Sequence, residues 1–120
     1  MFLAALALAA SLCASDFQQQ VDIAPHAGPQ TGILVKQDFA PGESTGQHAH
    51  PGVEIGYVVK GAIRITIGGL SPAEYEVKAG GSYHINRDVS HAIGNAGGEP
   101  AEVLTTYVVD VGRPVTDPKP

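Results

Sequence analysis

The 120-residue sequence has no tryptophan, one cysteine, one methionine and only seven lysines and arginines. A single cysteine cannot form a disulfide within the chain, so the fold must rest on packing and hydrogen bonds. Twelve acidic residues give a formal net charge of −5, and the basic residues form no run. Nucleic acids and anionic membrane surfaces attract clustered positive charge, which this sequence lacks. The composition therefore excludes both as expected partners and leaves small molecules and proteins.

One long apolar run is present, at the start of the sequence. Residues 1–15, MFLAALALAASLCAS, carry no charged side chain and end in small residues before Asp16. This pattern is typical of a secretory leader, although an apolar helix or strand of the fold is the alternative interpretation. The run is shorter than the roughly 20 residues needed to span a bilayer. We predict a periplasmic or secreted protein with no membrane attachment after leader removal, lacking both sulfur-containing residue types.

The remaining sequence consists mostly of short strand-like segments separated by glycine and proline. We predict strands at 31–39, 53–60, 62–67, 74–78, 82–85, 90–95 and 101–110. The 15 glycines and nine prolines supply turns between them, and no helical period competes. Short strands at this spacing indicate an all-β sandwich or barrel. The predicted organisation is one domain: an arm at 16–30, a barrel at 31–111 and a tail at 112–120.

The segment 53–60 is apolar on both faces. Ile55, Tyr57 and Val59 leave the face opposite Glu54, while Val58 shares the face of Glu54. A small barrel has only one interior, so an apolar outer face needs a cover. Either the arm at 16–30 or a second subunit could supply it. We predict a homodimer.

Three of the five histidines occupy positions suited to a metal site. His48 and His50 are two residues apart, so on an extended backbone both leave the same face, with α-carbons about 6.6 to 6.8 Å apart. Glu54 follows a Pro-Gly bend that lets a carboxylate approach the same point. His91 must arrive from a separate strand. A single histidine is more often a solvated surface residue, but this cluster follows a longer pattern.

In that pattern the sequence resembles the cupin family. The first cupin motif, Gly-x5-His-x-His-x3-Glu-x6-Gly, is met with every spacing kept by Gly42, His48, His50, Glu54 and Gly61. The second motif, Gly-x5-Pro-x-Gly-x2-His-x3-Asn, is met by Gly80, His91 and Asn95. Asn86 replaces its proline and Asp88 its second glycine. Both replacements are turn formers that tolerate unusual backbone angles, so we expect the turn to be kept.

The resemblance implies a double-stranded β-helix, or jelly-roll barrel, that holds one divalent metal ion. Carried over by position, its ligands are His48, His50, Glu54 and His91, with Fe, Mn, Ni and Zn all acceptable. One or two coordination positions would remain for water or substrate. This implies a metal-dependent enzyme of the dioxygenase or isomerase/lyase type acting on a small organic molecule, with Glu54 also catalytic. The alternative is a non-catalytic module that binds metal or a small ligand, because cupins share a fold while differing in reaction.

Some side chains outside this pattern also carry polar or reactive groups. Ser44 lies in a Gly-x-Ser-x-Gly sequence, but the hydrolase elbow that uses this motif needs a strand-turn-helix context. His26 is expected to be solvated in the arm, and His84 to point outward between two inward residues. Tyr107 and Gln37 are expected to line the pocket if the period-2 pattern holds without a bulge.

Overall fold

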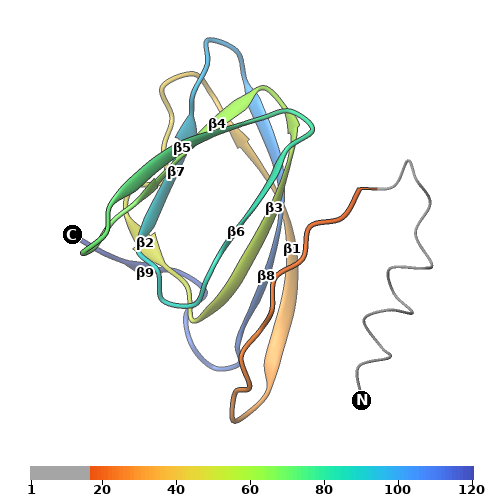
Figure 1. Ribbon diagram of the computed structural model, residues 1–120, viewed down its shortest axis with the longest axis vertical. Helices are drawn as coiled ribbons and strands as arrows, with labels where there is room; N and C mark the ends of the chain where they lie inside the picture. The colour runs from red at the N-terminus through yellow and green to blue at the C-terminus, as the bar shows by residue number, and fades with distance from the viewer. Residues whose placement is uncertain (1–16) are drawn as a thin grey trace.

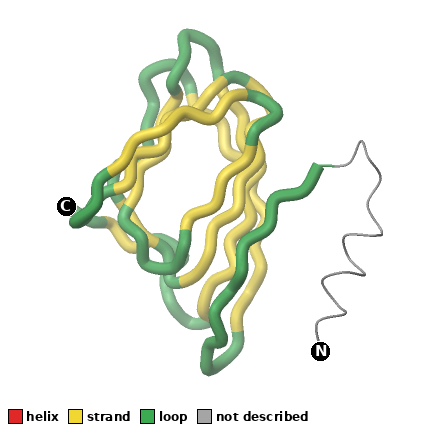
Figure 2. The backbone as a smooth tube through the Cα atoms, in the orientation of Figure 1, coloured by secondary structure: helices red, strands yellow, loops and turns green. Residues whose placement is uncertain are grey.

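The computed structural model describes residues 17–120, which form nine β-strands and no helix (Figures 1 and 2). The strands are β1 (Gln30–Phe39), β2 (His48–Ala49), β3 (Gly52–Lys60), β4 (Ala62–Ile67), β5 (Ala73–Lys78), β6 (Ser82–Ile85), β7 (His91–Asn95), β8 (Ala101–Asp110) and β9 (Asp117–Pro118). Over the same range there is consequently no helix that could cross a membrane. The predicted leader, residues 1–15, lies outside the described residues.

Each predicted strand corresponds to an observed one. β4, β6 and β8 have the predicted limits, and β1, β3, β5 and β7 differ by one residue at their first position. Two strands are too short to give a periodic signal: β2, which carries His48, and β9, which lies in the segment predicted as a tail. Within residues 17–120, strand-like segments bounded by glycine and proline therefore predicted every strand of four or more residues.

The strands form two antiparallel sheets that face each other as a jelly roll. One sheet has the order β1-β8-β3-β6 and the other β5-β4-β7-β2-β9. Strands far apart in sequence become neighbours, as β1 and β8 do with Gln30 opposite Asp110 and Phe39 opposite Ala101. The prediction of an all-β jelly-roll barrel is confirmed.

The hydrophobic core lies between the sheets. On β4, Ile63 and Ile65 are fully buried while Arg64 between them is exposed, as the period-2 pattern requires. The buried cluster comprises Phe39, Val58, Ile63, Ile65, Tyr83, Ile85, Ile93, Ala101 and Val103. It occupies one part of the interior, and the histidines occupy another.

The arm runs along the outer side of the β1-β8-β3-β6 sheet (Figure 1). The ring of Phe17 packs edge-on against Tyr57 with centroids 5.1 Å apart, and Gln19 contacts Ser82 and His84. The arm thus covers part of the apolar outer face that the sequence analysis identified. Val59 on the same face remains 41% exposed.

Asp110, the last residue of β8, ties the arm to the barrel. Arg87 donates two hydrogen bonds of 2.9 Å to its carboxylate, and His26 Nε2 lies 3.3 Å from Oδ2. The bonds from Arg87, opposed by burial, lower the pKa of Asp110 to about 2. His26 is exposed in the arm, as expected, and its ring also contacts Asp110.

Candidate metal centre

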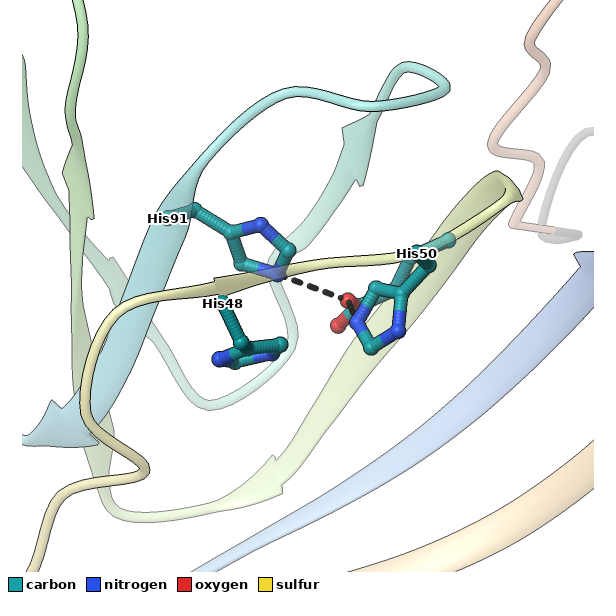
Figure 3. A group of neighbouring side chains, drawn as sticks. His48, His50 and His91 are labelled. Atoms are coloured by element: carbon teal, nitrogen blue, oxygen red, sulfur yellow. Dashed lines mark hydrogen bonds and ion pairs between the residues drawn. The ribbon is translucent and has the colours of Figure 1, made fainter. Parts of the chain in front are cut away.

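The four predicted ligands come together inside the barrel. His48 belongs to β2, His50 follows it directly, Glu54 lies on β3 and His91 on β7. Antiparallel pairing of β2 with β7 sets His48 directly opposite His91. All four side chains are buried, and one potential ligand atom from each lies within 4.8 Å of the others. Figure 3 shows the three rings converging from these separate segments.

Backbone carbonyls fix the orientation of each imidazole. The Nδ1 atoms of His48, His50 and His91 lie 2.9, 2.7 and 2.9 Å from carbonyl oxygens. A carbonyl oxygen only accepts, so each Nδ1–H is the donor and each neutral ring keeps its Nε2 lone pair for another partner. For His48 and His91 the carbonyl lies two residues earlier, at Gly46 and Val89. For His50 it belongs to Val115, in the C-terminal segment.

The remaining ring nitrogens and the carboxylate form a cluster of electron-pair donors. Glu54 Oε1 lies 3.0 Å from His91 Nε2 and 3.1 Å from His50 Nε2. The Nε2 atom of His50 is buried and makes no hydrogen bond of acceptable geometry. Lone pairs this close repel unless a proton or metal cation lies among them. The three nitrogens and one carboxylate therefore fit a divalent metal ion, the donor set that zinc and neighbouring metals accept.

The environment sets different protonation preferences within the cluster. Burial alone would raise the pKa of Glu54, but the adjacent imidazoles of His50 and His91 and the hydrogen bond from Tyr83 lower it to about 2. Burial lowers the pKa of His48. For His50 burial also acts downward, yet the neighbouring Glu54 carboxylate and the Val115 carbonyl raise its pKa above 6.5. The carboxylate is thus charged and ready to act as a ligand at neutral pH.

The turn before His91 keeps its shape despite the two motif replacements. Asp88 has a φ of 61°, the left-handed region that glycine occupies most easily. Aspartate is among the few other residues that adopt it at modest cost. The Asp88 amide donates to the His50 carbonyl at 3.0 Å, linking the two motifs. The expectation that the turn survives is confirmed.

Further polar side chains extend from the ligands into the barrel. Tyr107 is 7% exposed and its ring lies 4.7 Å from that of His50, while Gln37 donates towards the Tyr107 hydroxyl at 3.5 Å. Both point inward, as expected. Tyr83 and Thr105 continue this polar chain, and no sequence motif pointed to either of them. Their position opposite Gly56 depends on strand register, which the sequence alone does not specify.

The remaining candidates lie outside the cluster. Ser44 precedes β2, forms an isolated bridge with Gly94 and accepts a bond from the Gly46 amide at 3.4 Å. No strand-turn-helix surrounds it, because the described residues contain no helix. His84 is exposed on β6 and contacts Gln19, as its predicted outward direction requires.

Comparison with known proteins gives the same family. The Cupin domain family model (Cupin_2) matches residues 35–107, which include all four predicted ligands. The HTH-type transcriptional regulator PuuR of Escherichia coli (strain K12) is 32% identical over 79 residues, 65% of this chain and 41% of that protein. The chain thus spans about two fifths of the length of the curated relatives it matches.

Two solved structures show the same architecture. An oxalate oxidase aligns with a TM-score of 0.59 and 28% identity, covering 74% of this chain and 52% of that one. An oxalate decarboxylase from Bacillus subtilis, a protein with Mn(II) centres, aligns with a TM-score of 0.62 and 23% identity over 70% of this chain and 23% of that one. The family model spans more than half of the 120 residues. This chain therefore belongs to the Cupin domain family.

Proposed function

We propose that this protein binds one divalent metal ion through His48, His50, Glu54 and His91 and uses it to transform a small organic molecule. The observation that carries the proposal is the buried convergence of three Nε2 atoms and one carboxylate, with His50 Nε2 lacking any hydrogen-bond partner. Fe, Mn, Ni and Zn all accept such ligands. A bound ion would supply Lewis-acid or redox chemistry.

The proposed substrate is a small, oxygen-rich molecule, with simple carboxylic acids as the first class to test. The similarity to an oxalate oxidase at 28% identity supports this choice. Dioxygenase-type and isomerase/lyase-type reactions both fit, because the chain's own groups near the ligands are hydroxyls and amides that position a substrate. Such groups, contributed by Tyr107 and Gln37, can hold a carboxylate or carbonyl without fixing the reaction.

Glu54 is proposed to be the functional carboxylate of the centre. It could remain bound to the metal ion, where it contributes negative charge and fixes the coordination geometry. Alternatively, it could leave the metal ion and accept a proton from the substrate. Its Oε2 atom accepts a 2.6 Å hydrogen bond from Tyr83, and its side chain is almost fully buried. This restraint favours the role of a fixed ligand.

A non-catalytic binding module is the second candidate. It is favoured by the similarity to PuuR, a transcriptional regulator of which the aligned part covers 41%. No helix-turn-helix lies in residues 17–120, and the acidic composition gives no reason to propose nucleic acid as a partner. In this reading the same four side chains would hold metal, or a small ligand through metal, without turnover.

The first prediction is one metal ion per chain and its dependence on His91. His91→Ala should weaken metal binding tenfold or more. Removing a residue that only hydrogen-bonds to a ligand typically lowers metal affinity 10–100-fold, and removing the ligand itself should lower it at least as much. Elemental analysis and metal titration measure this, with His84→Ala as a control that should bind normally. Full metal retention by His91→Ala would overturn the assignment.

Turnover separates the two candidates. The metal-loaded protein would be incubated with a panel of small carboxylic acids, with and without oxygen. Oxygen consumption supports the dioxygenase type, and oxygen-independent conversion supports the isomerase/lyase type. Tight binding of a panel member without conversion supports the binding module.

Two further proposals concern location and partners. Residues 1–15 are proposed to be a secretory leader, giving a periplasmic or secreted protein that starts near Asp16. Soluble protein whose intact mass still includes Met1 would contradict this proposal.

The protein is proposed to form a homodimer through the outer face of the β1-β8-β3-β6 sheet. Leu34 and Leu104 on that face are 71% and 38% exposed.

A further inference from the structure

The two oxygens of Glu54 have different partners. Oε1 faces the Nε2 atoms of His50 and His91 at 3.1 and 3.0 Å. Oε2 accepts a hydrogen bond from the hydroxyl of Tyr83 at 2.6 Å, a length typical of a strong bond to a carboxylate. Tyr83 is only 4% exposed, so this bond is shielded from water. One oxygen is therefore directed at the candidate metal position and the other is held by Tyr83.

Strand register brings Tyr83 to this oxygen. On β6, Tyr83 pairs with Gly56 of β3, and Ile85 pairs with Glu54. The Tyr83 side chain must therefore cross Gly56 to reach Glu54, two residues earlier on the same face of β3. A Cβ atom at position 56 would overlap the Tyr83 ring. The missing side chain at Gly56 is what allows the ring to lie there, which explains a glycine in the middle of a strand.

The opposite side of the hydroxyl is closed by β8. Thr105 pairs with Gly56 from that strand, and its Oγ1 lies 3.4 Å from Tyr83 Oη. Thr105 in turn donates to Gln37 at 3.2 Å, so its own proton is used elsewhere. The Tyr83 proton has Glu54 as its acceptor. Burial raises the pKa of Tyr83 far above neutrality, and so the hydroxyl remains a donor.

Carboxylates bind metal ions through either one or two oxygens. We propose that Tyr83, seated on Gly56, is a positioning residue that restricts Glu54 to a single oxygen towards the metal ion and so keeps one coordination position free for substrate. The inference rests on the metal site proposed above and adds to it a residue outside the ligand set. It gives the buried Tyr83–Glu54 bond a function beyond stability.

The test uses the Tyr83→Phe variant loaded with Co(II), whose visible absorption weakens as its coordination number rises. The variant keeps the ring on Gly56 and removes only the hydroxyl. We expect it to retain one metal ion per chain and to absorb more weakly than the wild-type protein, because Oε2 becomes free to bind. Oxalate, added as a probe for the free coordination position of the metal ion, should bind the variant at least about tenfold more weakly than the wild-type protein. An effect of this size is typical when a residue that hydrogen-bonds to a metal ligand is mutated.

Tyr107→Phe is the matched control. It removes a second buried tyrosine hydroxyl, beside His50, that bonds to Gln37 and makes no hydrogen bond to Glu54. Measured without oxalate, its Co(II) spectrum should match that of the wild-type protein. Gly56→Ala, which displaces the Tyr83 ring, should reproduce the spectrum of Tyr83→Phe if it folds.

The outcomes separate the two proposals. A Tyr83→Phe spectrum identical to that of the wild-type protein, at equal metal content, would overturn the role of Tyr83 and leave the metal site standing. Equal spectral changes in Tyr83→Phe and Tyr107→Phe would also overturn it, because the effect would then reflect general loosening of the interior. Wild-type protein that binds no metal would instead overturn the proposed function itself.

Discussion

At the scale of single residues, the metal cluster is organised by what each side chain does with its second polar atom. The three imidazoles turn Nε2 inward because each Nδ1–H donates to a carbonyl oxygen. Glu54 turns Oε1 inward because Tyr83 holds Oε2. Such partners are what keep ligands in place when several like-charged or lone-pair atoms are forced together. The residues next to the ligands therefore define the site as much as the ligands do.

The differing protonation of His48 and His50 predicts how metal binding depends on pH. An imidazole must be neutral to bind metal. The pKa of His50 is raised, so as the pH falls His50 takes up a proton above pH 6.5, while His48, with its lowered pKa, does so only at lower pH. As the pH is lowered, metal affinity should therefore begin to fall while the pH is still above 6.5. Once His50 is protonated, the affinity should fall by about tenfold per pH unit for one bound proton.

Metal titrations between pH 5.5 and 8 measure this dependence. The exposed His84→Ala variant provides the control and should follow the wild-type curve. A metal affinity that stays constant down to pH 5.5 would show that no proton competes with the metal ion for His50 and would contradict its assignment as a ligand.

At the scale of elements, the C-terminal segment has a role that its composition does not suggest. Its strand β9 pairs with β2, with Pro118 opposite His48. The Lys119 amide donates to the Gln47 carbonyl at 3.0 Å, and the Val115 carbonyl accepts the His50 Nδ1–H. The segment therefore holds β2 in place and orients one of the proposed ligands, His50, although only two of its residues form a strand.

Removing residues 114–120 should weaken metal binding without unfolding the barrel. The truncation deletes the acceptor for His50, and partners of this kind typically contribute 10–100-fold to metal affinity. Metal titration measures the loss, and circular dichroism checks that the β-structure remains. Val115→Ala keeps the carbonyl and should bind metal normally. Wild-type affinity in the truncated protein would refute the role of the segment.

At the scale of the whole molecule, the two sheets enclose a single interior while one outer sheet face stays partly apolar. The arm covers Tyr57 through Phe17, but Leu34, Val59 and Leu104 remain exposed. Lys36 lies among them, 3.5 Å from Glu102 and 4.0 Å from Asp38. A face with apolar residues and both signs of charge is suited to pairing with a copy of itself across a two-fold axis.

The proposed dimer can be tested through Leu34. Light scattering of the protein at micromolar concentration should give twice the mass of one chain. Leu34→Asp should raise the dimer dissociation constant at least about tenfold, since it places a charge in an apolar contact. Leu70→Asp, at a fully exposed position on the β4–β5 turn, should leave the dimer intact. A monomer mass for the wild-type protein would exclude the dimer.

The sequence by itself determined the seven longer strands, their inner faces and the four candidate ligands. Strand alternation and the His48–His50–Glu54 spacing are local properties, set by the period of two residues in an extended chain. The tertiary structure decided which distant groups meet. The pairing of His48 with His91, the crossing of Gly56 by Tyr83 and the approach of Val115 to His50 all depend on register between strands far apart in sequence. Shifting a strand by one residue reverses its faces, and nothing local to those residues specifies the partner.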